Sequence, residues 1–264
     1  MPAIQLSRLR KQAENLPQFF NNPEKLTQEI IDLFEYYSDR TFRPGVVGRP
    51  IPIINSYKIA TPVLQEILAV LSPIVATDPQ SSLALVDNFW KKEILELRIL
   101  AADLIGKIPL KDSKPIVERI LVWVLEYKED SVLERLSGKG MKNYRSAHKD
   151  DYYADTKLWL TYKERKIVIF ALLVLLADLQ EIKFENLPIF LRLLAKYIEN
   201  PPKYLIPYLS DLVKLLAKTS PQETTFFLRK SYLASKNAST KRIIRISLDS
   251  FPKEAGKSLK DLIK

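Results

Sequence analysis

The amino-acid sequence predicts an all-α protein in which helical hairpins stack into a solenoid, an α-α superhelix. Three observations support this prediction. Helix-capping residues followed by proline recur along the chain, apolar residues between them recur at helical spacing, and no segment alternates with the period of two that strands require. Short connections between the expected helices favour antiparallel neighbours and a helix-pair period of roughly 35–45 residues.

In the amino-terminal half, helices are expected near residues 3–15, 23–38, 62–76, 79–92, 94–108, 113–127 and 129–137. Asn22-Pro23, Thr61-Pro62 and Asp78-Pro79 each indicate an N-cap followed by proline at the first helical position. Apolar residues then follow on one helical face, as in the series Leu64, Ile67, Leu68 and Leu71. These signals give both the starts and the buried faces of the helices.

In the carboxyl-terminal half, helices are expected near residues 162–178, 186–199, 203–219, 221–234, 239–250 and 252–263. Ser220-Pro221 is a further N-cap and proline pair. Glu223 three residues after Ser220, and Glu164 three residues after Thr161, have the spacing of reciprocal capping boxes. Leucines at 205, 209, 212 and 216 form another helical stripe.

Two stretches interrupt the helical pattern. Residues 40–56 hold three prolines and two glycines, so a regular helix is not expected there. The prediction is therefore a helical cap with an irregular linker over 1–56, followed by one helical-repeat domain over 57–264. Residues 137–155 are polar and rich in tyrosine, and they predict either a long surface loop or a flexible element that clamps a ligand.

Composition excludes several kinds of site. The chain has no cysteine and a single histidine, His148, which excludes disulfides and thiolate metal sites and argues against a histidine metal cluster or a Ser-His triad. No phosphate-binding glycine loop, dinucleotide fingerprint or nucleophile elbow is present. We expect no metal and no small-molecule cofactor. The longest apolar run, Ile167–Ala177, is too short for a bilayer, and the chain is expected to be cytoplasmic, without membrane contact, and monomeric.

Positive charge gathers at one end of the chain. Residues 200–264 carry 13 Lys/Arg and 5 Asp/Glu, a balance of +8, whereas residues 1–199 carry 28 and 26, a balance of +2. Charge gathered on one region of a helical protein favours a polyanionic partner, with nucleic acid first.

Three segments resemble the AlkD-like family of DNA alkylation repair glycosylases, which are built of HEAT-like repeats. The first holds Ile59, Thr61-Pro62, Trp90, and Glu96-x-Arg98 ahead of an alanine-containing helix with Asp103. The second, residues 212–248, follows the family's order of helix, AKT-x-P, helix, Ser-x-Lys-Arg and helix. The third places Tyr162 and Arg165 where the family has Trp-x-x-Arg. The resemblance covers about residues 57–250.

The resemblance implies a basic concave surface that holds double-stranded DNA through its phosphates. The family excises cationic alkylpurines, and a carboxylate stabilises the oxocarbenium-like sugar. The family motif Trp-Asp-Ser-Val-Asp ends in that carboxylate, but this chain reads Glu129-Asp130-Ser131-Val132-Leu133. A second family tryptophan falls at Asp211. Either Asp130, Glu134 or Asp211 has taken the catalytic role, or the chain binds DNA without excising bases.

The residues expected to contact DNA fall into two groups. The resemblance implies Arg165, Lys214 and Tyr162. Clustered charge indicates the remaining ones, which are Arg229, Lys230, Lys241, Arg242, Arg245, Arg145 and Lys149. Tyr152 and Tyr153 could stack on nucleic acid or pin the segment to the domain. A protein-binding scaffold is the alternative from another class, since helical solenoids also bind peptides and domains.

Overall fold

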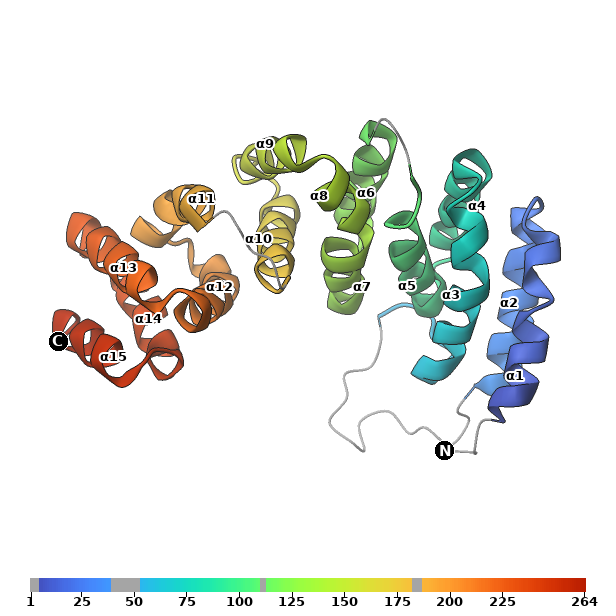
Figure 1. Ribbon diagram of the computed structural model, residues 1–264, viewed down its shortest axis with the longest axis horizontal. Helices are drawn as coiled ribbons and strands as arrows, with labels where there is room; N and C mark the ends of the chain where they lie inside the picture. The colour runs from blue at the N-terminus through green and yellow to red at the C-terminus, as the bar shows by residue number, and fades with distance from the viewer. Residues whose placement is uncertain (1–4, 39–52, 110–112, 182–186) are drawn as a thin grey trace. The chain divides into compact units, whose positions relative to one another are not determined.

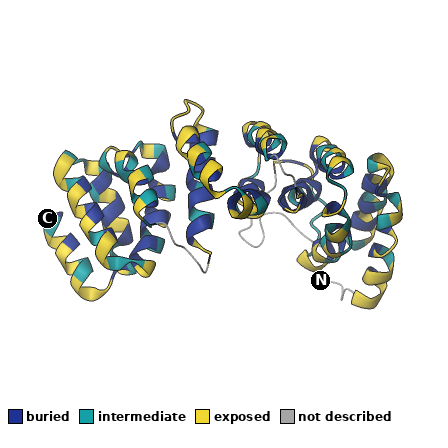
Figure 2. Cartoon of the chain, turned by 45° about the horizontal axis from the view of Figure 1, so that its top comes forward, coloured by how far each residue is buried: buried dark blue, intermediate teal, exposed yellow. Residues whose placement is uncertain are grey.

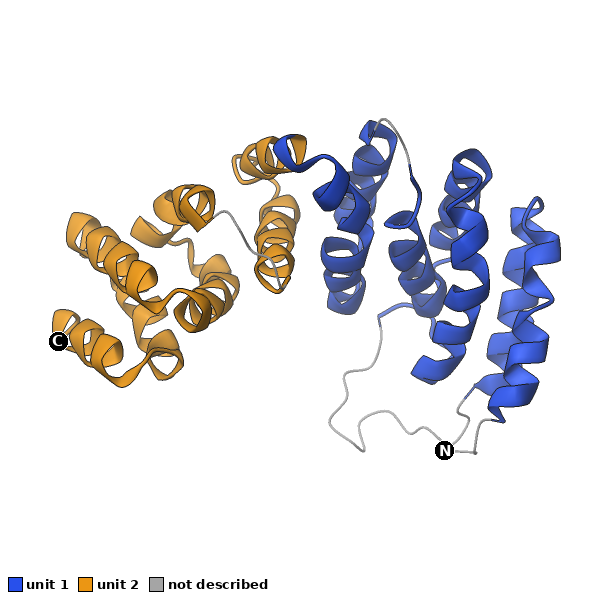
Figure 3. Cartoon of the chain, in the orientation of Figure 1, with its two compact units in different colours: residues 1–150 blue, residues 151–264 orange. Residues whose placement is uncertain are grey.

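The computed structural model describes residues 5–38, 53–109, 113–181 and 187–264, and they divide between Asp150 and Asp151 into two compact units (Figure 3). Each unit is described by itself. The described residues are overwhelmingly helical, and they contain an isolated parallel bridge between Asn55 and Ile94 in place of any extended sheet. The all-α fold class is confirmed.

Unit 1 runs from the amino terminus to Asp150. Its elements are α1 (Leu6–Ala13), η1 (Leu16–Phe19), α2 (Pro23–Tyr37), α3 (Thr61–Val75), α4 (Pro79–Lys91), α5 (Leu95–Ile105), α6 (Lys114–Glu126), α7 (Asp130–Arg135), the π-helix η2 (Leu136–Gly140), α8 (Lys142–Ala147) and the first residues of α9 (Lys149–Trp159). Helices α1, α3, α5 and α7 pack side by side in that order, and α2 and α4 pack together beside them (Figure 1).

Unit 2 holds the rest of α9 and the helices that follow it. These are α10 (Arg165–Leu179), α11 (Leu187–Glu199), η3 (Lys203–Leu205), α12 (Ile206–Thr219), α13 (Pro221–Ser235), α14 (Ala238–Ser247), η4 (Leu248–Ser250) and α15 (Lys253–Leu262). Helices α10, α12 and α14 form one layer, and α11, α13 and α15 form the other (Figure 1). Consecutive helices thus alternate between layers, as stacked hairpins require.

The buried residues lie where the predicted apolar stripes place them. Leu64, Ile67 and Leu71 are buried on α3, and Leu209, Leu212 and Leu216 are buried on α12. In Figure 2 the buried stripes face inward within each unit, with exposed residues along the opposite helix faces. No helix among the described residues is long and apolar enough to cross a membrane.

Two of the predicted caps are confirmed. The Asn22 side chain accepts from Lys25 N at 3.1 Å, and the Asp78 side chain accepts from Ser81 N at 3.1 Å. Two others differ. Helix α3 has Ala60 as its N-cap with Thr61 already helical, and α10 begins at Arg165 after Glu164, so the Thr161 hydroxyl donates backward to Leu158 O instead of forming a capping box.

The predicted loop over 137–155 was wrong, because this stretch is largely helical. It contains most of η2, all of α8 and the first half of α9. Buried Tyr144 and Tyr152 give it an apolar face that its polar composition hides. Residues 40–52 of the other irregular stretch lie outside the described residues, and the predicted domain boundary at 56 stays a prediction.

Candidate nucleic-acid interface

The segment that enters α3 is held by the buried carboxylate of Glu96. Its Oε1 accepts hydrogen bonds from Ser56 Oγ at 2.7 Å, Lys58 N at 2.8 Å and Ile59 N at 3.5 Å. Lys58 adopts the left-handed backbone region with φ 57°, which turns its amide toward the carboxylate. The acid is therefore a framework residue that fixes the turn ahead of Thr61-Pro62.

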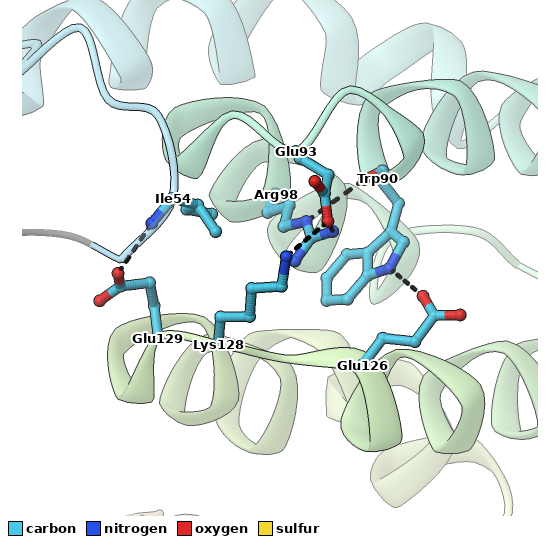
Figure 4. Close-up of polar contacts among 7 residues, drawn as sticks. All are labelled: Ile54, Trp90, Glu93, Arg98, Glu126, Lys128 and Glu129. Atoms are coloured by element: carbon cyan, nitrogen blue, oxygen red, sulfur yellow. Dashed lines mark hydrogen bonds and ion pairs between the residues drawn. The ribbon is translucent and has the colours of Figure 1, made fainter.

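Arg98 joins the end of α4 to α5 through a stack of three flat groups. Its guanidinium lies 4.6 Å from the centroid of the Trp90 ring, and Trp90 stacks on Trp123 at 4.5 Å with an interplanar angle of 6°. Arg98 Nε also donates to Trp90 O at 3.2 Å, while Trp90 Nε1 donates to Glu126 at 2.9 Å (Figure 4). Both tryptophans are almost fully buried, so they hold the core together and are not available to DNA bases.

The turn between α6 and α7 is attached to the same framework. Lys128 Nζ donates to Glu93 Oε1 at 2.9 Å, and Glu93 also pairs with Arg98 at 3.4 Å. The hydrogen bond from Lys128, followed by its charge, lowers the pKa of Glu93. The Glu129 carboxylate accepts from the backbone amide of Ile53 and from that of Ile54, the second of which is drawn in Figure 4. Two separate anchors therefore position the start of α7.

At the carboxyl ends of α5 and α7, one buried carboxylate pairs with an arginine. Asp103 on α5 is 6% exposed and pairs with Arg135 Nη1 at 3.3 Å. Burial raises the pKa of Asp103, and the charges of Arg135, Lys139 and Lys107 act in the opposite direction. The sequence names Asp103 only within a motif. The spacing of Asp103 to Lys107 and of Arg135 to Lys139, four residues each, was the available signal.

In unit 2, helix α12 has one open face. Helices α10 and α14 flank it, and α13 packs on it from the other layer. Its more exposed residues, Asp211, Lys214 and Lys218, must therefore lie on the side away from α11, α13 and α15. Lys214 Nζ pairs with Asp211 at 3.0 Å, an exposed contact that contributes little stability.

The neighbouring helices of this layer add further cations. On α14, Arg242 and Arg245 are exposed, and Lys241 Nζ donates to Lys264 O at 3.4 Å. On α10, exposed Arg165 lies 4.8 Å from the centroid of the Tyr204 ring, which directly precedes α12. Tyr162 is 36% exposed three residues earlier. The layer of α10, α12 and α14 thus collects most of the cations that the sequence singled out.

The family model for the DNA alkylation repair enzyme matches residues 54–245, more than half of the chain. This chain belongs to the DNA alkylation repair enzyme family. Neither a curated protein nor a solved structure matches it significantly. The match begins at the segment held by Glu96 and Glu129 and ends at Arg245 on α14, so it spans both units.

Position 133, where the family resemblance implies the catalytic carboxylate, is a core position in this family member. Leu133 on α7 is 1% exposed, as is its neighbour Val132. Asp130 and Glu134 lie on the exposed side of the same helix, and Asp211 is an exposed residue of unit 2. Glu129, at the place of a family tryptophan, is occupied with the amides of Ile53 and Ile54.

Arg229 and Lys230 lie apart from the other cations, on α13 in the layer of α11 and α15. An apolar groove of about 450 Å³ runs between α11 and α13, and Phe226 beside it is 71% exposed. Lys230 lines this groove together with Arg192. Lys230 and Arg192 therefore border an apolar surface of the second layer.

The tyrosine-rich segment is packed within the protein. The Tyr152 hydroxyl donates to Val174 O at 3.1 Å, and the Tyr153 hydroxyl donates to Asp178 at 2.8 Å, which pins α9 to α10. Trp159 is 2% exposed and contacts Phe170 with ring centroids 5.8 Å apart. In unit 1, Arg145 is 8% exposed and buried on α8, whereas Lys149 at the start of α9 is exposed.

Proposed function

We propose that this member of the DNA alkylation repair enzyme family binds duplex DNA through the phosphate backbone. The observation that carries the proposal is the layer of α10, α12 and α14 in unit 2. These three adjacent helices carry exposed Arg165, Arg242 and Arg245 and half-exposed Lys214. Arginine and lysine side chains on a rigid layer suit phosphates, because the spacing of phosphates along the duplex is fixed. Such contacts position the protein on DNA without reading the base sequence.

In this proposal the residue at position 133, Leu133, takes no part in base excision. A buried leucine cannot stabilise a cationic sugar, and electrostatic catalysis requires charges that are fixed and shielded from water. Asp130, Glu134 and Asp211 are exposed to solvent, where such an interaction is weak. We therefore propose DNA binding without excision, and an active glycosylase with a relocated carboxylate is the competing outcome.

The scaffold alternative rests on the other layer. An apolar groove on the face that also carries the cations would favour a peptide partner, but the groove of unit 2 lies between α11 and α13. Helices α10, α12 and α14 instead carry Lys214, Arg242 and Arg245, and this groove does not lie among them. Arg192 and Lys230 also line the groove, but the larger number of the singled-out cations on α10, α12 and α14 favours DNA as the partner of that layer.

The binding proposal is tested by the salt dependence of affinity for a fluorescent 20-base-pair duplex. Each phosphate contact contributes a slope of about −0.9 in log affinity against log salt. The double variant Arg242→Gln/Arg245→Gln is expected to reduce the slope by about two such contacts. Arg229→Gln/Lys230→Gln is the matched control, since it removes the same charge from α13. Equal losses from both pairs, or a wild-type slope near zero, would refute the proposal.

The absence of excision is tested on methylated duplex DNA by chromatography of the released bases. We expect no 7-methylguanine or 3-methyladenine above spontaneous release. Enzymatic release that disappears in Asp130→Asn, Glu134→Gln or Asp211→Asn would establish the relocated carboxylate and overturn this part of the proposal. Duplex binding and base release are separate measurements, so one part can stand without the other.

A further inference from the structure

Unit 1 carries a charge cluster that the expected DNA contacts do not include. Lys107 follows α5 directly, Arg135 ends α7, and Lys139 lies in η2. Arg135 pairs with the carboxylate of Asp103, and the charges of Lys139 and Lys107 also act on it. The Asp103 side chain is 7% exposed and that of Arg135 41%, whereas both lysines are exposed.

Asp103 occupies only part of the Arg135 guanidinium. The two contacts with the carboxylate oxygens, at 3.5 and 3.3 Å, use the same nitrogen, Nη1. A guanidinium has five N–H donors in a fixed plane, so those on Nε and Nη2 are left for a ligand or for water. A carboxylate that holds one nitrogen of a guanidinium leaves its remaining donors for a second acceptor, such as a phosphate.

The backbone around Lys139 packs closely against the end of α5. A Cβ at Gly106 would lie 1.8 Å from Lys139 O, and a Cβ at Gly140 would lie 3.2 Å from Ala102 O. The absence of side chains at these two glycines lets η2 approach the end of α5 closely. This close approach brings the backbone of Lys139 in η2 next to the end of α5, the helix that carries Asp103 and is followed by Lys107.

We propose that Arg135, Lys107 and Lys139 form a binding site in unit 1 for one backbone phosphate of duplex DNA, and that Asp103 is its positioning residue. This inference rests on the proposed function, because it takes the same ligand. It adds a DNA contact in unit 1 to those proposed in unit 2. It also gives a role to Asp103, whose negative charge lowers the net positive charge of the cluster.

The cost of Asp103 to the fold supports a positioning role. Burial disfavours its charged form, and a neutral side chain of the same shape would avoid that cost. Residues kept against stability are often kept for a function that needs fixed charge. Here the fixed charge holds Arg135, whose side chain is 41% exposed.

Replacing Asp103 separates positioning from simple charge. Asp103→Asn removes a negative charge, so charge alone predicts tighter DNA binding. A positioning role predicts weaker binding, by threefold or more, because the guanidinium loses its fixed orientation. In an Arg135→Gln background the same replacement should cause no further weakening. The measurement is the affinity for the fluorescent 20-base-pair duplex at two salt concentrations, with folding checked by thermal unfolding.

The cations are tested through the salt slope. Arg135→Gln and Lys139→Gln should each make the slope shallower by up to about 0.9, and Lys91→Gln on α4 is the matched exposed-lysine control. Unchanged slopes for Arg135→Gln and Lys139→Gln, or tighter binding by Asp103→Asn, would overturn the inference. If Arg242→Gln/Arg245→Gln still flattened the slope, the proposed function would stand without it, whereas a wild type that binds no duplex would remove both.

Free phosphate is distinguished from the DNA backbone by a separate arm. Sodium phosphate is added in place of sodium chloride at equal ionic strength, and thermal unfolding is recorded for the wild type and Arg135→Gln. Phosphate that stabilises only the wild type, with no change of the DNA salt slope between the two proteins, would assign the site to free phosphate and overturn the DNA assignment. A difference in the DNA salt slope between the wild type and Arg135→Gln, without stabilisation of the wild type by phosphate, supports the DNA assignment.

Discussion

Gly106 offers the sharpest test of how unit 1 is packed, through the variant Gly106→Ala. The residue follows α5 with φ −74°, a backbone region that alanine adopts freely, so the replacement introduces no backbone strain of its own. Its Cβ would lie 1.8 Å from Lys139 O, 2.8 Å from Lys139 C and 3.0 Å from Gly140 Cα. All three atoms belong to the backbone of η2, so no side chain can rotate away.

The magnitude follows from the displacement that these distances require. An ordinary contact of about 3.5 Å requires η2 to move by about 1.7 Å from the end of α5. Overpacking of this kind costs about 1–3 kcal/mol, and backbone obstruction favours the upper end. For a chain of this size, about 3 kcal/mol lowers the unfolding temperature by roughly 6–12 °C.

Gly138→Ala is the matched control in the same π-helix. A Cβ at Gly138 meets nothing within 4 Å, so its replacement should be neutral or stabilise by up to about 1 kcal/mol. Urea unfolding followed by circular dichroism measures both variants against the wild type. A loss below about 1 kcal/mol for Gly106→Ala, or equal losses for the two variants, would refute the close approach of η2 and α5.

Three further outcomes are expected from single replacements. Glu96→Ala should cost about 2–4 kcal/mol in urea unfolding, because it leaves the Ser56 hydroxyl and the Lys58 amide without their acceptor; a loss under 1 kcal/mol would contradict its framework role. Asp103→Asn should stabilise unit 1 near pH 7. Since the folded pKa lies above 3.8, wild-type stability is lost as pH rises through that pKa, so the gain in unfolding temperature must shrink toward pH 3; a gain that is constant with pH contradicts the assignment. Asp211→Asn should change stability by less than about 1 kcal/mol, because its pair with Lys214 is exposed, and a larger loss would reveal burial.

Local signals in the sequence are sufficient for the helices that begin with a cap and proline. Asn22 and Asp78 cap α2 and α4 because their side chains accept the free amides of the first turn, a property of the residue and its position alone. The loop predicted over 137–155 was wrong for a different reason. Its helices are short and bury only scattered residues such as Tyr144 and Tyr152, so tertiary packing stabilises them and the local pattern does not reveal them.

The cations of the candidate interface show what charge counting misses. Arg229 and Lys230 are close in sequence to Arg242 and Arg245, and clustered charge alone predicts one DNA-contacting group. The structure places the first two on α13 and the others on α14, in different layers. The alternation of consecutive helices between layers was implicit in the predicted hairpins, and it separates residues on successive helices. Arg145, by contrast, is buried through contacts that no local pattern indicates.

Contacts between distant residues were beyond sequence reasoning. Glu129 meets Ile53 and Ile54 across some 75 positions, and Asp103 meets Arg135 across 32. A carboxylate at a helix start or on a helix face has many possible partners, and only the folded chain selects one. The resemblance found Glu96 and Arg98 by their order, but their bonds to the segment before α3 and to Trp90 O became visible only in the structure.

The residues that match the family resemblance and the residue that departs from it have different places in the structure. Glu96, Arg98 and Trp90 match the resemblance and form the bonds that hold α3, α4 and α5 together. Leu133 departs from the family resemblance, and at 1% exposure it belongs to the core. A carboxylate there would be buried among apolar neighbours, and isolated buried charges cost several kcal/mol. The packing around Leu133 therefore disfavours an ionised side chain at this position of α7.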